Sequence, residues 1–298
     1  MVAISEDGTR AGSEGLGVNV CILLGGAIQG KALSLTSEVT TLAGSTWGYA
    51  DGTGTSAQFY SPDGITTDGT NLYVADTYNN RIRKIVISTA EVSTLAGSSY
   101  GYADGTGSGA QFAYPSGITT DGTNLYVADT GNGRIRKIVI STGEVTTLAG
   151  SSYGYADGTG IAAQFYNPYD ITTEGTNLYV SDMYNHRIRK IVISTGEVTT
   201  LAGSSEGHAD GTGTSAQFDY PRGITTDGTN LYVADTGNGR IRKIVISTGE
   251  VTTLAGSSYG YADGNGTAAQ FDYPYDITTD GINLYVTDTN NNRIRCIK

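Results

Sequence analysis

Residues 118–149 decide the fold, and they read ITTDGTNLYVADTGNGRIRKIVISTGEVTTLA. The stretch contains four short runs rich in apolar and β-branched residues, at 118–120, 125–128, 134–140 and 145–149. Residues typical of tight turns, mainly Asp, Gly and Asn, separate these runs. The runs contain neither proline nor a helical periodicity. The stretch therefore predicts four short antiparallel strands.

The same stretch recurs along the chain at a fixed spacing of 53 residues. The tripeptide Leu-Ala-Gly marks each copy, and it begins at Leu42, Leu95, Leu148, Leu201 and Leu254. A unit of about 40–50 residues with four antiparallel strands, repeated several times, is typical of a β-propeller blade. The sequence therefore predicts an all-β fold in which each repeat forms one four-stranded blade.

The number of blades depends on how residues 1–44 are interpreted. The segment Ile4–Thr9 is similar to Ile65–Thr70, and Glu38–Gly44 has the sequence of a fourth strand. We therefore expect a six-bladed β-propeller that forms one domain over 1–298. Residues 1–44 would be a degenerate first blade, and 45–298 would hold five repeats, the last without its outer strand. In the alternative, there are five blades, Glu38–Gly44 lends its strand to the last one, and 1–37 is a tail.

Composition and charge exclude several classes of protein. The 298 residues carry a net charge of −11, which disfavours nucleic acid as a partner because binding to phosphates needs clustered cations. No apolar run reaches the roughly 18 residues of a membrane span. The two cysteines, Cys21 and Cys296, are too few for a disulfide scaffold. In a closed ring they would lie in neighbouring blades, so they could form one disulfide or remain two separate buried thiols.

The compartment stays open from the sequence. Acidic residues Glu6, Asp7 and Glu14 stand where a secretory signal would carry basic ones, so no signal peptide is visible. The surface composition and the single Asn265-Gly-Thr sequon favour an extracellular or cell-envelope setting.

Three segments of the repeat resemble a known family. The runs Tyr114–Ile118, Asn124–Asp129 and Asn132–Lys137 are similar to the NHL repeat, and the similarity extends over five copies. The resemblance implies a propeller, usually with six blades. It does not imply one function, because the family includes interaction platforms, sensor domains, RNA-binding domains and a few metal-dependent lyases, with hydrolases on related propellers.

Differences among the copies indicate which face could bind a ligand. In a four-stranded blade, the loop that leads into the first strand emerges on the same face as the turn between strands two and three. The variable positions gather there, whereas the turns of the opposite face are almost constant. Loops also drift more freely than strands, so variation alone does not prove a site. The candidate ligand-binding residues are Asp63, Ser116, Tyr169, Arg222, Tyr275, Tyr78, Tyr184 and His186.

This face predicts a non-enzymatic interaction scaffold for protein, peptide or glycan ligands, acting as a monomer and without a cofactor. Aromatic residues crowd the long loop that leads into each blade, and rings of this kind stack on sugars and peptides. The alternative for these rings, above all for Tyr102, is that they fill the space between adjacent blades. The loop residues concerned are Trp47, Tyr100, Tyr102, Tyr153, Tyr155, Tyr259 and Tyr261.

The alternative function is a metal-dependent lyase or hydrolase with its site at the axial mouth. Asp170 and Asp276 replace a glycine of the other copies at the start of the first strand, and with His186 they could bind a divalent metal such as Ca²⁺ or Zn²⁺. They could equally be turn residues. The repeated Asp129 and Arg134 flank a hairpin, so we expect them to form a salt bridge or a turn hydrogen bond. Asp104-Gly105 is expected to form a turn.

Overall fold

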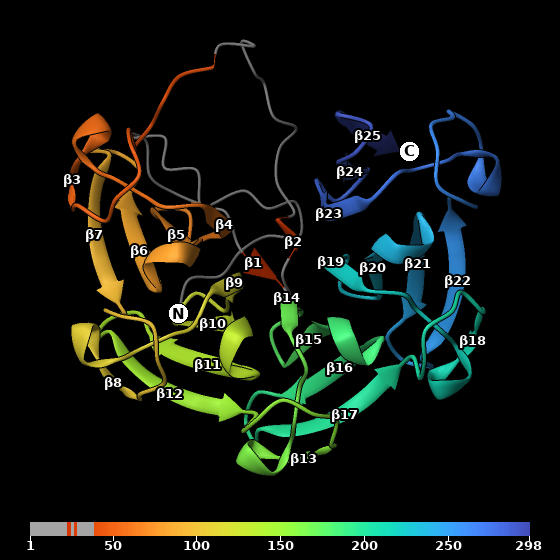
Figure 1. Cartoon of the computed structure of the whole chain (residues 1–298), viewed down its shortest axis with the longest axis horizontal. Coiled ribbons are helices and arrows are strands. Elements are labelled where there is room, and N and C mark those ends of the chain that lie inside the picture. Colours follow the sequence, from red (N-terminus) through yellow and green to blue (C-terminus); the bar gives the residue numbers. More distant parts are fainter. Residues whose placement is uncertain (1–22, 25–26, 29–38) are drawn as a thin grey trace, which may run out of the picture.

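The computed structural model describes residues 23–24, 27–28 and 39–298. Figure 1 shows five blades arranged in an arc around an axis, with the first and the last repeat at the two ends of the arc. The described residues form strands and three-residue 3₁₀ helices, so the all-β propeller is confirmed. None of the described helices is long or apolar enough to cross a membrane.

Each of the first four blades is a five-stranded sheet. The first blade contains β3 (Gly52–Thr53), β4 (Pro62–Thr67), β5 (Asn71–Asp76), β6 (Arg81–Val86) and β7 (Glu91–Ala96). The second contains β8 (Gly105–Thr106), β9 (Pro115–Thr120), β10 (Asn124–Asp129), β11 (Arg134–Val139) and β12 (Glu144–Ala149). The third contains β13 (Gly158–Thr159), β14 (Pro168–Thr173), β15 (Asn177–Asp182), β16 (Arg187–Val192) and β17 (Glu197–Ala202). The fourth contains β18 (Gly211–Thr212), β19 (Pro221–Thr226), β20 (Asn230–Asp235), β21 (Arg240–Val245) and β22 (Glu250–Ala255).

The last blade has three strands, and short elements complete the inventory. Its sheet contains β23 (Pro274–Thr279), β24 (Leu284–Asp288) and β25 (Arg293–Ile297). One hairpin precedes the blades, formed by β1 (Leu23–Leu24) and β2 (Ala27–Ile28). The 3₁₀ helices are η1 (Gly54–Ser56), η2 (Thr77–Asn79), η3 (Gly107–Gly109), η4 (Thr130–Asn132), η5 (Gly160–Ala162), η6 (Met183–Asn185), η7 (Gly213–Ser215), η8 (Thr236–Asn238) and η9 (Gly266–Ala268).

The order of strands in a blade places the first long strand at the axis. The second blade runs β8-β12-β11-β10-β9, with antiparallel pairing throughout. β9 contacts β4 and β14, the corresponding strands of its two neighbours, so it is the innermost strand. The four predicted strands are therefore correct. Sequence reasoning missed the outermost strand, because Gly105–Thr106 comes from the long loop and pairs with β12 at only two residues.

The prediction of six blades is not supported, and the five blades described agree with the alternative count. The case for a sixth blade rested on Ile4–Thr9 and Glu38–Gly44. The first segment and Glu38 lie outside the described residues. Residues 39–44 carry the sequence of a fourth strand, but among the described residues they form no strand. The Cys21–Cys296 pairing also stays a prediction, since Cys21 lies outside the described residues and Cys296 is an exposed residue of β25.

The hydrophobic core lies between neighbouring blades. One buried cluster joins Tyr73 and Ile82 of the first blade to Phe112, Ile118 and Val127 of the second. The alternation of strands explains this, because side chains on both faces of each inner strand meet an adjacent sheet. Phe112 is fully buried, and burial of one such ring stabilises the fold by roughly 1.5–3 kcal/mol.

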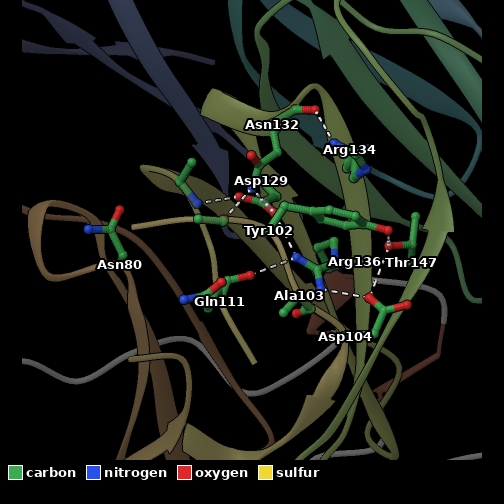
Figure 2. A network of polar contacts seen from close by, with 12 residues as sticks. Asn80, Tyr102, Ala103, Asp104, Gln111, Asp129, Asn132, Arg134, Arg136 and Thr147 are labelled. Atoms are coloured by element: carbon green, nitrogen blue, oxygen red, sulfur yellow. Dashed lines mark hydrogen bonds and ion pairs between the residues drawn. The ribbon is translucent and has the colours of Figure 1, made fainter. Parts of the chain in front are cut away.

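An arginine fixes the long loop of each blade and is fully buried in the first four, as Figure 2 shows for Arg136 in β11. Arg136 forms ion pairs with Asp129 at 2.8 Å and with Asp104 of the loop at 2.7 Å. It also donates to the carbonyl oxygens of Gln111 and Ala103. Charge-assisted hydrogen bonds of this kind are stronger than those between neutral groups. The same arrangement recurs at Arg83, Arg189, Arg242 and Arg295.

The expected partnership of Asp129 with Arg134 is therefore wrong in part. Asp129 accepts a hydrogen bond from the Asn132 side chain in the turn and from the backbone N–H of Ala113 outside it, but its ion pair is with Arg136. Arg134 donates to the Asn132 carbonyl oxygen, and its guanidinium lies 3.7 Å from the centre of the Tyr102 ring. Tyr102 thus stacks on its own blade. Asp104 lies in the turn as expected, and its ion pair with Arg136 also connects the long loop to β11.

Candidate functional site

Five of the candidate residues lie at the start of the inner strands, directly after the proline of each repeat. Threonine hydroxyls hold these strand starts across the blade interfaces. Thr130 of η4 donates to the Pro168 carbonyl oxygen of the next blade at 2.8 Å. Ser116, which is buried, donates to the Tyr169 carbonyl oxygen at 2.6 Å. The residues after the prolines are therefore fixed at one end of the axis.

Three of these side chains meet across the axis. Tyr169 donates to Asp63 Oδ2 at 2.9 Å, and its hydroxyl is also hydrogen-bonded to that of Tyr275. The two tyrosine rings are 5.6 Å apart and nearly perpendicular. Burial, followed by the negative charge of Asp63, raises the pKa of Tyr169 well above its ordinary value. The hydroxyl therefore stays protonated and acts as a hydrogen-bond donor.

Arg222 joins this group through the faces of the rings. Its guanidinium lies 4.4 Å from the centre of the Tyr275 ring and 5.2 Å from that of Tyr169. Among the described residues, Arg222 forms no ion pair, unlike the buried arginine of each blade. The stacked rings thus hold a cation whose charge no carboxylate neutralises directly. We call Asp63, Tyr169, Arg222 and Tyr275 the mouth cluster.

A cavity of about 390 Å³ lies below the mouth cluster and is lined by all five inner strands. Asp170 and Asp276 lie on its wall. Asp170 accepts the backbone N–H groups of Ile171 and Ile224 at 2.8 and 2.9 Å, and Asp276 accepts that of Ile277 at 2.8 Å. Burial, followed by the charge of Asp276, raises the pKa of Asp170, and burial also raises the pKa of Asp276. Two carboxylates thus face one polar cavity.

The remaining glycines at this position leave room for these two aspartates. A Cβ atom on Gly117 would lie 2.6 Å from Asp170 Cα, and one on Gly223 would lie 2.6 Å from Asp276 Cα. Side chains at neighbouring inner strands would therefore collide. Glycine at 64, 117 and 223 therefore permits the close approach of neighbouring inner strands.

His186 does not join Asp170 and Asp276. It follows η6, away from the axial cavity, and its Nδ1 atom lies 3.5 Å from Asp219 Oδ1. One atom each of His186, Asp219 and Glu206 lie within 4.8 Å of one another. Burial, followed by the charge of Glu206, raises the pKa of Asp219, whereas His186 lowers it. The structure thus separates the carboxylates at the axis from the histidine.

Tyr78 and Tyr184 lie in rows of exposed aromatic rings on the same face. The centre of the Tyr78 ring lies 5.1 Å from that of Tyr60 and 5.6 Å from that of Tyr114. Tyr78 also lines a second cavity of about 260 Å³, together with Asp63, Tyr169 and Tyr275. Tyr184 lies 5.0 Å from Tyr166 and 5.5 Å from Tyr220.

Sequence reasoning missed the ring partners of these two tyrosines. The available signal was the aromatic residue one or two positions before the proline in each repeat, at Tyr60, Tyr114, Tyr166, Tyr220 and Tyr273.

Comparison with known proteins agrees with this architecture. The family model described as "NHL repeat" matches residues 112–138 and 218–244. The human NHL repeat-containing protein 2 is 27% identical over 86% of this chain and 41% of that protein. The chloroplastic protein SUPPRESSOR OF QUENCHING 1 of Arabidopsis thaliana is 30% identical over 68% of this chain and 26% of that protein. The chain thus spans less than half the length of either relative.

A solved structure supports the fold alone. A chain in the crystal structure of a nidogen/laminin complex superposes with a TM-score of 0.58 at 20% identity, covering 80% of this chain and 75% of that one.

Proposed function

Since the chain belongs to the NHL-repeat family of β-propellers, we propose that it is a non-enzymatic interaction scaffold whose loop face binds a protein, peptide or glycan ligand. The mouth cluster is the observation that carries this proposal. It combines two tyrosine rings, one guanidinium that forms no ion pair within the described part of the chain, and one exposed carboxylate, above a polar cavity.

The chemistry of the mouth cluster suits a polar ligand with some apolar surface. Tyrosine rings bury apolar faces of sugars or peptides, and their hydroxyls keep a hydrogen-bonding tip. Arg222 offers donors in a planar fork, which matches carboxylate groups of peptides and of acidic sugars. The exposed rows that contain Tyr78 and Tyr184 extend this surface outward from the axis.

The experiment tests binding to glycan and peptide arrays with the wild-type chain and two variants. In the double variant Tyr169→Ala/Tyr275→Ala the mouth cluster loses both rings. In the control Ile282→Ala an apolar side chain that is 83% exposed is shortened in a turn on the opposite face. Array members bound by wild type and control but lost in the double variant would support the proposal. Equal binding by all three proteins, or no binding at all, would argue against it.

A metal-dependent lyase or hydrolase is the second candidate function, and the facing carboxylates of Asp170 and Asp276 favour it. Carboxylates with raised pKa values in a cavity are suited to acid–base chemistry or to holding a divalent ion such as Ca²⁺. A thermal melt with Ca²⁺ or Mn²⁺ tests this role. A stabilising shift that Asp170→Gly and Asp276→Gly abolish would support it, and both substitutions restore the glycine of other blades.

A further inference from the structure

The interface between the third and fourth blades differs from the other interfaces at three positions that meet in space. His186 follows η6 of the third blade, and Glu206 and Asp219 lie in the loop that leads to β19 of the fourth. The corresponding positions at the preceding interface are Gly133, Tyr153 and Tyr166, and those at the following one are Gly239, Tyr259 and Asp272. We propose that His186, Glu206 and Asp219 form a binding site for a divalent transition-metal cation such as Zn²⁺.

The distance between the first two ligands suits a metal better than a hydrogen bond. Nδ1 of His186 and Oδ1 of Asp219 are 3.5 Å apart. A hydrogen bond between nitrogen and oxygen is usually about 2.7–3.2 Å long. Two ligand atoms about 2.1 Å from a tetrahedral Zn²⁺ are about 3.4 Å apart. The pair therefore has the spacing of one edge of a zinc tetrahedron.

Nδ1 of His186 and Oδ1 of Asp219 can both act as electron-pair donors at this site. Nδ1 of His186 accepts a long hydrogen bond from the Tyr220 amide at 3.4 Å, so this ring nitrogen is the unprotonated one, and a metal would take the place of the amide on its lone pair. Oδ1 of Asp219 is buried and has no hydrogen-bond partner among the described residues. A buried acceptor without a partner is costly, and a cation would satisfy it.

Glu206 adds the third ligand and a second negative charge. One oxygen of its carboxylate lies within 4.8 Å of the other two ligand atoms, and the residue is exposed. Two carboxylates this close repel each other unless a cation lies between them. Three protein ligands leave the fourth position of a tetrahedral ion open for water or for a group of a ligand.

The site adjoins the exposed aromatic surface. The His186 ring lies 5.1 Å from the Tyr220 ring, at the end of the row that includes Tyr184. A metal held here would therefore lie beside the exposed aromatic rings. The metal site itself does not depend on the proposed scaffold function.

The repeat supplies matched variants for the test. His186→Asn introduces the residue found at positions 80 and 292, and Glu206→Tyr introduces the residue found at 100, 153 and 259, so both variants should fold. The chain has one other histidine, His208, which is tyrosine in the four other copies, at positions 49, 102, 155 and 261. His208→Tyr is therefore the control for nonspecific binding to histidine.

The measurement is a calorimetric titration of untagged, EDTA-treated protein with ZnCl₂. We expect one Zn²⁺ per chain for wild type and for His208→Tyr, and an affinity at least about 100-fold weaker for His186→Asn and Glu206→Tyr. Absence of Zn²⁺ binding to wild type would overturn the proposal, as would unchanged affinity in His186→Asn. Loss of binding on Asp170→Gly instead would assign the ion to the axial cavity and would also overturn it.

Discussion

Replacing Arg136 by methionine tests the network of buried ion pairs. The variant keeps most of the apolar volume but leaves the carboxylate of Asp129, which is fully buried, without its cation. Removing one partner of a buried pair usually costs about 3–5 kcal/mol. The carbonyl oxygens of Gln111 and Ala103 also lose their donors, so the cost should lie at the upper end of this range. Urea-induced unfolding followed by circular dichroism measures it.

The cost should depend on pH in a defined direction. Burial raises the pKa of Asp129 above 3.8 and Arg136 lowers it, so in the Arg136→Met variant this pKa rises further. A carboxyl whose pKa is higher in the folded state than in the unfolded state destabilises the fold as pH rises through that interval. As the pH falls from 7 to 5, Asp129 takes up a proton and the variant regains part of its lost stability relative to wild type.

The last blade provides the matched control. Arg295 occupies the same position, but its side chain is 10% exposed and its loop partner Asp263 is 80% exposed. Asp288 is as buried as Asp129, but Arg295 itself is partly exposed and Asp263 is open to water, so Arg295→Met should cost less than Arg136→Met. A cost below about 1 kcal/mol for Arg136→Met at pH 7, or a cost that does not change between pH 7 and pH 5, would refute the reasoning.

Three further predictions use the same internal comparison. Ile241→Ala should lower the free energy of unfolding in urea by about 2–5 kcal/mol, because Ile241 is fully buried. Ile294→Ala, at the same position of the last blade, should lower it by less than about 0.5 kcal/mol, because Ile294 is 70% exposed; equal losses would contradict this. Asp170→Gly should raise the melting temperature more at pH 8 than at pH 5, since burial raises the pKa of Asp170; a gain independent of pH would count against it. Tyr102→Leu should lower the free energy of unfolding by about 0.5–1 kcal/mol, because the Tyr102 ring loses its contact with the Arg134 guanidinium. A double-mutant cycle between Tyr102 and Arg134 that shows no coupling would disprove that contribution.

Much of the fold could be predicted because the repeat states each local signal several times. The apolar run 125–128 is bounded by turn residues, and β10 (Asn124–Asp129) extends it by one residue at each end. The convergence of Tyr169 and Tyr275 follows from topology, since the residue after each proline begins an inner strand. Position in the repeat was therefore enough to bring these candidates together.

The features that could not be predicted depend on side-chain reach or on contacts distant in the sequence. Asp129 lies directly opposite Arg134 in the strand register, yet its ion pair is with Arg136. The register identifies neighbouring backbones, but it does not say where a long guanidinium ends. The strand Gly105–Thr106 has no pattern of its own, because two residues cannot show alternation.

The contact between Tyr169 and Tyr275 has a mechanical consequence for the arc of blades. Tyr169 belongs to the third blade, and through its hydroxyl it reaches Asp63 of the first and Tyr275 of the fifth. Among the described residues, these are side-chain contacts across the mouth, without any sheet that joins the two ends. Swinging the fifth blade outward would break them and leave every backbone hydrogen bond within the blades intact. The width of the bore is thus set by these contacts together with the apolar packing between the fourth and fifth blades, and water or an incoming hydroxyl can replace the hydroxyl contacts alone.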